Sequence, residues 1–246
     1  MYVNKKNIIL CSLWVTLLVT HLPLLAQQPS GDSVFISYQV NLKKQELKLY
    51  WKDDKGQTFN SLQNLANWLG GKGQKLVFAM NAGMYKTDYA PLGLFIQEQK
   101  TVTPLNTKTG DGNFYLKPNG VFYTTTDSKA VICKTENFIN SSKIKYATQS
   151  GPMLVIDGQI HPEFKQGSAN LNIRNGVGIL PNNEAVFAMS KTAVNLYDFA
   201  SYFKALGCRN ALYLDGFVSR TYLPEKNWVQ TDGDFGVMVG VTTSLR

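Results

Sequence analysis

The sequence predicts a single-domain α+β protein, with antiparallel or mixed β-sheets built from hairpins and a few flanking helices. Short segments of alternating apolar residues recur along the chain, turn residues join them in pairs, and only two segments have the periodicity of an amphipathic helix. No linker, low-complexity run or internal repeat divides the chain. We therefore expect residues 27–246 to form one domain.

The strands are expected to form hairpins. Residues 34–40 and 46–51 alternate like half-buried strands. The clearest hairpin spans residues 153–160, where Asp157-Gly158 can supply the positive φ angles of a two-residue turn. The other expected pairs are residues 121–125 with 130–133, and residues 177–180 with 185–189. Repeated hairpins favour antiparallel sheets.

Two helices are predicted, at residues 61–70 and 195–207, because each segment has an apolar stripe at helical spacing. Both are preceded by polar residues that suit an N-cap and end at a glycine. The caps are Asn60 or Ser61 in the first helix and Asn195 in the second, and the terminal glycines are Gly70 and Gly207.

The N-terminus has the pattern of a signal peptide over residues 1–26. Lys5 and Lys6 precede an apolar stretch, and Ala26 offers a small residue for cleavage before a polar segment. A retained membrane anchor is the alternative interpretation, since about 18 apolar residues can span a bilayer. Cleavage predicts an extracytoplasmic protein, periplasmic or secreted, without a stable membrane span.

Composition narrows the function classes. With 44% hydrophobic and 17% charged residues, the chain can bury a core. Loss of Lys5 and Lys6 with the signal peptide lowers the formal charge from +8 to +6, and no stripe of aromatic and basic residues indicates nucleic-acid binding. Cleavage would also remove Cys11 and His21. Cys133, Cys208 and His161 would then be the only cysteines and histidine left, and they cannot build a zinc site. The two cysteines could form a disulfide or stay unpaired.

Polar residues at the ends of apolar segments are the candidates for chemistry, since no P-loop, nucleophile elbow or zinc-protease motif is present. Asn81, Ser150 and Arg174 occupy such positions, and Asp215 ends the apolar segment 211–214. Each has an ordinary alternative. Asn81 and Ser150 could belong to simple turns, Arg174 could be a surface charge, and Asp215 could begin an Asp-Gly turn.

The order of these elements resembles the phosphodiester glycosidase family. The resemblance covers residues 76–246 and is specific as an ordered set. The matching elements are Asn81-Ala82-Gly83-Met84, Ser150-Gly151-Pro152, Arg174-Asn175-Gly176-Val177-Gly178 and Leu214-Asp215-Gly216-Phe217-Val218-Ser219.

The resemblance implies a hydrolase that cleaves the glycosidic bond of a sugar-1-phosphodiester, such as an N-acetylglucosamine-1-phosphodiester, in envelope or extracellular glycans. No cofactor or metal site is expected, and the sequence does not identify any bound ion. Asp215 is expected to activate water or stabilise the oxocarbenium-like centre, Arg174 to stabilise the departing phosphate, and Asn81 to orient the substrate. The expected substrate-binding residues are Gly83, Lys86, Asp111, Ser150, Gly151, Gly216 and Ser219.

Two departures from the family pattern leave other functions open. Phe217-Val218 replaces glycines, and Asn175 replaces a hydroxyl residue after Arg174. A non-catalytic module that binds a sugar phosphate or glycan is the main alternative, with Phe217, Tyr222 and Trp228 as a stacking surface. A metal-dependent phosphodiesterase that cuts the P–O bond is less favoured, because such sites usually draw on clustered His and carboxylate ligands.

Overall fold

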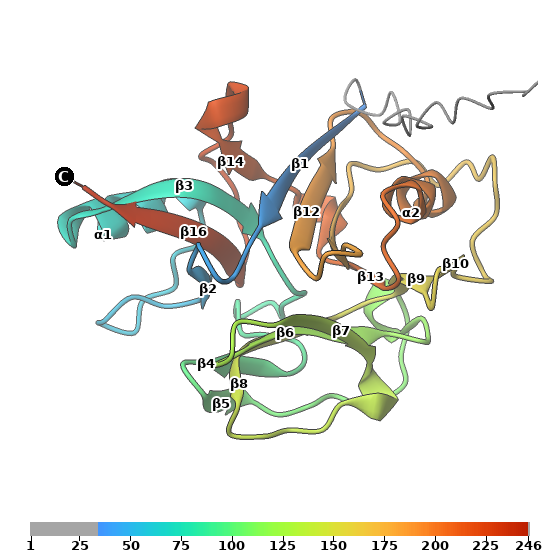
Figure 1. Ribbon diagram of the computed structural model, residues 1–246, viewed down its shortest axis with the longest axis horizontal. Helices are drawn as coiled ribbons and strands as arrows, with labels where there is room; N and C mark the ends of the chain where they lie inside the picture. The colour runs from blue at the N-terminus through green and yellow to red at the C-terminus, as the bar shows by residue number, and fades with distance from the viewer. Residues whose placement is uncertain (1–33, 246) are drawn as a thin grey trace, which may run out of the picture.

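The computed structural model describes residues 34–245, which form three antiparallel β-sheets and two α-helices (Figure 1). The α+β class, the hairpins and the single domain expected from the sequence are confirmed. The predicted signal peptide lies outside the described residues. Within residues 34–245, no helix is long and apolar enough to cross a membrane.

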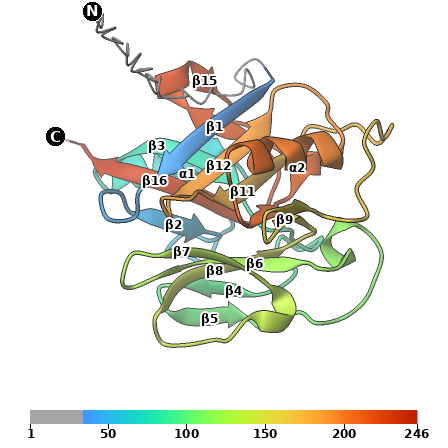
Figure 2. The ribbon, with the colours of Figure 1, turned by 45° about the vertical axis from the view of Figure 1, so that its right-hand side comes forward.

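The first sheet has six strands in the order β1-β12-β11-β13-β9-β10. Its strands are β1 (Phe35–Val40), β9 (Met153–Ile156), β10 (Gln159–Ile160), β11 (Asn175–Ile179), β12 (Ala185–Ser190) and β13 (Ala211–Tyr213). Helix α2 (Leu196–Ala205) lies in front of this sheet in Figure 2 and packs Phe199 and Phe203 against it. Asn195 caps α2 by accepting a hydrogen bond from the Asp198 N–H.

The second sheet has five strands in the order β15-β14-β3-β16-β2. They are β2 (Leu47–Tyr50), β3 (Gln74–Asn81), β14 (Thr221–Leu223), β15 (Trp228–Val229) and β16 (Met238–Ser244). Helix α1 (Leu62–Gly71) covers one face, with Ser61 as its N-cap and Leu62, Leu65 and Leu69 buried.

The third sheet has the order β5-β4-β8-β6-β7 and lies below the other two in Figure 1. Its strands are β4 (Phe95–Gln97), β5 (Lys100–Thr103), β6 (Gly120–Thr125), β7 (Ala130–Lys134) and β8 (Ile144–Ser150). Short 3₁₀ helices connect the strands: η2 (Asn113–Tyr115), η3 (Thr135–Asn137), η4 (Gly216–Val218) and η5 (Pro224–Lys226).

One apolar core joins the three sheets. Phe187 from the first sheet packs among Phe78 from the second and Phe122 from the third, with ring centroids 5.5 and 5.6 Å away respectively. Burial of each such side chain contributes about 1.5–3 kcal/mol relative to leaving it in water. The three sheets therefore meet at a fixed junction.

Local chemistry explains where the sequence predictions hold. Asp157 and Gly158 have φ angles of 48° and 83°, so the tight turn between β9 and β10 is confirmed. Residues 148–150, which could have been a turn, instead complete β8, because Thr148 and Ser150 pair with Phe122 and Gly120 of β6.

The cysteines and the histidine within residues 34–245 are buried or partly buried in the fold. Cys133 and Cys208 are both free thiols, and burial raises their pKa values to about 11 and 12. His161 is buried, its Nε2 lies 3.2 Å from the Lys117 carbonyl oxygen, and its ring stacks on Phe164. Burial lowers the pKa of His161, so it stays neutral at pH 7.

Candidate functional site

The candidate site lies where ends of strands from all three sheets meet. Asn81 ends β3, Ser150 ends β8, Asn175 begins β11, and Asp215 follows β13 by two residues. Apolar strands drive these ends together because their side chains share the central core, which leaves the polar residues that follow them at one junction. The sequence order is thus converted into a cluster in space.

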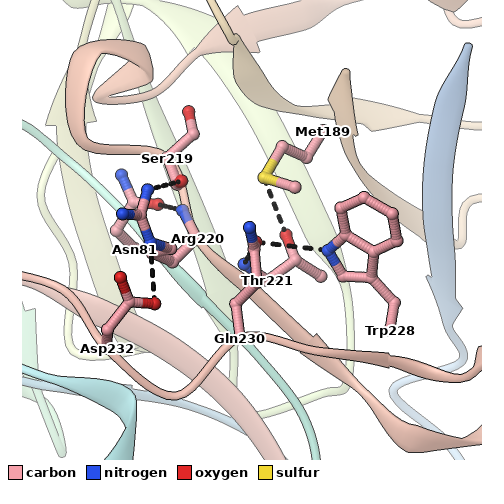
Figure 3. Close-up of polar contacts among 8 residues, drawn as sticks. All are labelled: Asn81, Met189, Ser219, Arg220, Thr221, Trp228, Gln230 and Asp232. Carbon is pink, nitrogen blue, oxygen red and sulfur yellow. Dashed lines mark hydrogen bonds and ion pairs between the residues drawn. The ribbon is translucent and has the colours of Figure 1, made fainter. Parts of the chain in front are cut away.

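Asn81 is fully buried and holds both ends of the loop that carries Asp215. Its Nδ2 donates to the Asp215 carbonyl oxygen over 2.6 Å. Its Oδ1 accepts from the Arg220 N–H over 2.9 Å, as Figure 3 shows. Asn175 supports this amide from behind, because its Nδ2 donates to the Asn81 Oδ1 over 3.0 Å. Asn81 therefore acts on the loop backbone and not through an exposed side chain.

The loop between Asp215 and Arg220 forms the 3₁₀ turn η4. The Ser219 Oγ donates to the Gly216 carbonyl oxygen over 2.7 Å, which places this buried hydroxyl inside the turn. Gly216 has no room for a side chain, since a Cβ there would meet the Tyr213 hydroxyl oxygen at 1.9 Å. Phe217, by contrast, is 88% exposed at the apex of the loop.

Arg174 is 1% exposed and bonded entirely to neutral groups. Its Nε donates to the Val194 carbonyl oxygen over 2.8 Å, its Nη1 to the Tyr213 hydroxyl over 3.2 Å, and its Nη2 to the Asn170 carbonyl oxygen over 2.8 Å. No carboxylate forms an ion pair with it anywhere in residues 34–245. The structure thus contains a buried cation without a protein counter-anion.

The Tyr213 hydroxyl links this cation to the Asp215 loop. It accepts a hydrogen bond from Arg174 and another from the main chain of Gly216. Burial raises the pKa of Tyr213, whereas the neighbouring Arg174 opposes that rise. A positively charged side chain and the Asp215 carboxyl therefore flank one phenol without touching each other.

The Asp215 carboxyl is partly buried, and burial raises its pKa to about 6. A carboxyl with this pKa can change its protonation state near neutral pH, which suits an acid or base in catalysis. The Asp215 carboxylate in turn raises the pKa of Tyr85, although burial is the larger cause, and the Tyr85 value reaches about 12.

Glycines bring the third sheet close to this loop. A Cβ on Gly83 would meet the Thr148 Oγ1 at 2.2 Å, so the Asn81–Gly83 segment lies directly against β8. The main chain after Ser150 and Gly151 is joined to β13, since the Pro152 carbonyl oxygen accepts from the Tyr213 N–H. Only a residue without a side chain permits the first of these approaches.

Two buried oxygen atoms at the junction lack a hydrogen-bond partner. They are the Ser150 Oγ and the Asn175 Oδ1. Buried polar groups in folded proteins are nearly always paired with protein, water or ligand. These two atoms are therefore exceptions to that rule, and both lie at the junction of the three sheets.

A pocket of about 240 Å³ opens beside Arg174. Its wall includes Asn170, Tyr197 and two charged residues of opposite sign, Glu163 and Lys165. The volume is sufficient for part of a sugar phosphate, since pockets for complete drug-sized ligands occupy about 300–1,000 Å³.

The structure does not bring every expected site residue into this cluster. Lys86 and Asp111 are exposed on loops, and neither side chain makes a hydrogen bond or ion pair with the other site residues among those described. Of the aromatic residues expected to form a stacking surface, only Phe217 is largely exposed. Tyr222 and Trp228 are partly buried against the core clusters.

Sequence reasoning missed three residues at the site. Tyr213 was indistinguishable from a core aromatic, because it lies within an apolar strand. Arg220 and Tyr85 were not singled out, although both follow recognised elements by one residue. Their positions directly after the family-like elements were the sequence signal that could have identified them.

Comparison with known proteins identifies the family. A model of the phosphodiester glycosidase family matches residues 74–242, which include all of the strand ends described above. The chain belongs to this family. The Escherichia coli (strain K12) family relative YigE, an uncharacterized protein, is 42% identical over 188 residues, covering 76% of this chain and 73% of YigE.

Solved structures share the fold of this phosphodiester glycosidase family member. The catalytic domain of zebrafish N-acetylglucosamine-1-phosphodiester alpha-N-acetylglucosaminidase, auto-inhibited by its pro-peptide, aligns with a TM-score of 0.57 at 15% identity, covering 88% of this chain and 86% of that one. A hypothetical protein from Synechocystis aligns with a TM-score of 0.53 at 13% identity, covering 85% of this chain and 59% of the Synechocystis chain. Family and fold together indicate a phosphodiester-glycosidase-like function.

Proposed function

We propose that this protein is an exported hydrolase that cleaves the glycosidic bond of a sugar-1-phosphodiester, of the N-acetylglucosamine-1-phosphodiester type, in envelope or extracellular glycans. The observation that carries the proposal is the buried guanidinium of Arg174, which has only neutral partners and lines a pocket. A buried cation is stabilised by an anion, and a phosphodiester supplies one.

The leaving group explains why so few catalytic groups are needed. A phosphate monoester has a second pKa of about 6, so it leaves an anomeric carbon more readily than an alcohol does. The site then requires positive potential near the phosphate, which Arg174 provides through the Tyr213 hydroxyl, and a carboxylate near the anomeric carbon. Asp215 fills the second role, either activating water or stabilising the oxocarbenium-like centre.

Asn81 contributes indirectly to this mechanism. Its amide fixes the main chain of Asp215 and of Arg220, so the backbone from which the carboxylate projects is held in one position before substrate arrives. Preorganisation of this kind lowers the reorganisation needed in the transition state. We therefore assign Asn81 a positioning role.

The test is release of free sugar from N-acetylglucosamine-1-phosphodiesters by the purified protein, with Asp215→Asn and Arg174→Ala as variants. We expect sugar release to fall by at least about a hundredfold in Asp215→Asn, in line with removal of a general base. Full activity in both variants would refute the assignment. Hydrolysis in ¹⁸O-labelled water should put the label on the sugar, whereas cleavage of the P–O bond would put it on the phosphate.

Export is part of the proposal and has its own test. The composition of residues 1–26 supports it. N-terminal sequencing of the protein from cell fractions should find Gln27 as the first residue, outside the cytoplasm. An intact Met1 in a membrane fraction would favour the anchor instead.

A non-catalytic binding module is the second candidate, and the exposure of Phe217 favours it. A large aromatic side chain that is 88% exposed on the loop that carries Asp215 can stack on a sugar ring. Its partners would be sugar phosphates or glycans, as for the enzyme. A sugar-1-phosphodiester that stays bound and uncleaved after long incubation would support this function.

A further inference from the structure

Arg220 is held in a fixed relation to Asp215. The Arg220 N–H donates to the Oδ1 of Asn81 (Figure 3). The Nδ2 of the same amide donates to the Asp215 carbonyl oxygen. The two main-chain groups are therefore attached to opposite sides of one rigid, planar side-chain group. A large shift of the Arg220 main chain relative to the Asp215 main chain would break one of these hydrogen bonds.

The guanidinium of Arg220 is also held in place, but not all of its nitrogen atoms donate hydrogen bonds to the protein. Its Nε donates to the Asp232 Oδ1 over 2.8 Å and its Nη1 to the Ser219 carbonyl oxygen over 2.9 Å. The side chain remains 36% exposed. Among residues 34–245, nothing accepts a hydrogen bond from Nη2. A fork of donors is thus oriented by the protein and available to an external anion.

The segment that carries Asp232 places this guanidinium at the edge of the candidate site. Two residues after Asp232, the Asp234 carbonyl oxygen accepts a hydrogen bond from the Tyr85 hydroxyl. Tyr85 is near enough to the Asp215 carboxylate to feel its charge. Hydrogen bonds thus tie Arg220 and Tyr85 to the same short segment, residues 232–234, and Asn81 ties Arg220 to the Asp215 main chain.

The two arginines of the site differ in what they can bind. Arg174 is buried, and three of its nitrogen atoms already donate to protein oxygens. Arg220 keeps Nη2 without a protein acceptor and is accessible. A guanidinium edge of this kind suits the oxygens of a phosphoryl group. We propose that Arg220 is a substrate-binding residue whose Nη2 edge contacts a phosphoryl oxygen of the sugar phosphate, while Arg174 contributes positive potential from within.

This inference rests on the proposed function for the identity of its ligand. It predicts that substitutions of Arg220 and of its ion-pair partner Asp232 change phosphate affinity in opposite directions. Asp232 competes with an incoming anion for Arg220. Arg220→Gln should therefore weaken phosphate binding, whereas Asp232→Asn should strengthen it. An ion pair that serves only the fold predicts instead that both variants lower the melting temperature and leave affinity unchanged.

The experiment is titration calorimetry with N-acetylglucosamine 1-phosphate, and with N-acetylglucosamine as the uncharged probe. Hydrogen bonds to charged groups contribute about 1.5–3 kcal/mol, so Arg220→Gln should weaken binding of the phosphate about ten- to hundredfold. Binding of the uncharged sugar should not change. Arg220→Lys keeps the positive charge but lacks the planar guanidinium, so its phosphate affinity should lie between those of the wild-type protein and Arg220→Gln.

Arg209→Gln is the matched control. Arg209 forms a surface ion pair with Asp157 over 3.2 Å, and its side chain is 81% exposed on the loop before β13. Its loss should leave phosphate affinity unchanged. Circular dichroism and thermal melts of each variant will verify folding before affinities are compared.

The outcomes separate this inference from the proposed function. Undiminished phosphate affinity in folded Arg220→Gln, or no phosphate binding by the wild-type protein, would overturn the inference. Sugar release with an unchanged KM in Arg220→Gln would do the same while leaving the glycosidase function intact. Phosphate binding that depends on Arg220, without hydrolysis of any diester tested, would support the inference and contradict the enzyme.

Discussion

The Nδ2 of Asn81 donates a 2.6 Å hydrogen bond to the main-chain carbonyl oxygen of Asp215, across 134 positions of sequence. Because the other end of the amide holds Arg220, one buried side chain fixes the loop that carries the candidate catalytic carboxyl. The position of Asp215 therefore depends on β3, in the second sheet, as much as on β13, from which it emerges.

Asn81→Ala should destabilise the fold and reduce any hydrolytic activity. It leaves the Arg220 N–H and the Asp215 carbonyl oxygen without their partner, at a cost of about 2–5 kcal/mol in the free energy of unfolding. Urea unfolding followed by circular dichroism measures this. Asn64→Ala, which removes an exposed amide bonded to the Phe59 carbonyl oxygen, should cost at most about 1 kcal/mol. Equal effects of the two substitutions would contradict the special role of Asn81.

Gly216→Ala should be strongly destabilising because its Cβ would overlap the Tyr213 hydroxyl oxygen at 1.9 Å. We expect a loss of about 2–4 kcal/mol in the free energy of unfolding, as for other forms of overpacking. In a Tyr213→Phe background the same change should cost less, although ring carbon atoms remain within 3 Å.

A double-mutant cycle of Gly216→Ala and Tyr213→Phe, measured by denaturant unfolding, gives the coupling free energy between the two positions. A coupling free energy of zero would show that the new Cβ and the Tyr213 hydroxyl do not collide. Gly70→Ala is the control. Nothing lies within 4 Å of a Cβ at that position in α1, so the change should be neutral or stabilise the helix by up to about 1 kcal/mol.

Asp215 should make both stability and activity depend on pH. Burial raises its folded-state pKa from 3.8 to about 6, so the folded protein binds the proton more tightly than the unfolded chain does. The stability contributed by the protonated form is complete below about pH 4 and is lost as pH rises through 6. Asp215→Asn should therefore stabilise the protein at pH 7, by about 1–3 kcal/mol, and flatten this pH dependence.

If ionised Asp215 acts in catalysis, kcat/KM should rise with pH up to a plateau above about 6. Sugar release measured between pH 4 and 8 would show this. A rate that is independent of pH across this range would indicate that the Asp215 carboxyl does not titrate in the mechanism.

Phe217→Ala should weaken binding of the sugar without destabilising the fold. The side chain is 88% exposed, so its removal costs little packing, whereas loss of stacking on a sugar ring should reduce affinity by about tenfold. Ile139→Ala is the matched control, since Ile139 is 83% exposed on the loop that leads to β8. Identical sugar affinity in both variants would remove Phe217 from the site.

Local sequence patterns were sufficient to predict the hairpins, both helices and the residues at the strand ends. The Asp157-Gly158 turn and the Asn195 cap are determined by neighbouring residues, so their geometry follows from a few positions of sequence. The site is different. The Asn81–Asp215 hydrogen bond joins residues from two sheets, and no local pattern encodes it.

Tyr213 shows why some site residues could not be predicted. Its position within an apolar strand is typical of a core aromatic, and its ring is indeed buried. Only the tertiary structure shows that its hydroxyl meets both Arg174 and Gly216. The substrate-binding roles of Lys86 and Asp111 stay predictions, and both side chains are exposed on loops.

The position of β16 has a consequence for biosynthesis. This strand comprises residues 238–244, and it separates β3 from β2, which has no other neighbour in the second sheet. A nascent chain on the ribosome therefore cannot close that sheet until nearly all of residues 34–245 have been made. Such long-range pairing slows folding. The second sheet should therefore stay open until residues 238–244 have left the ribosome, whereas the strands of the third sheet, all within residues 95–150, can pair earlier.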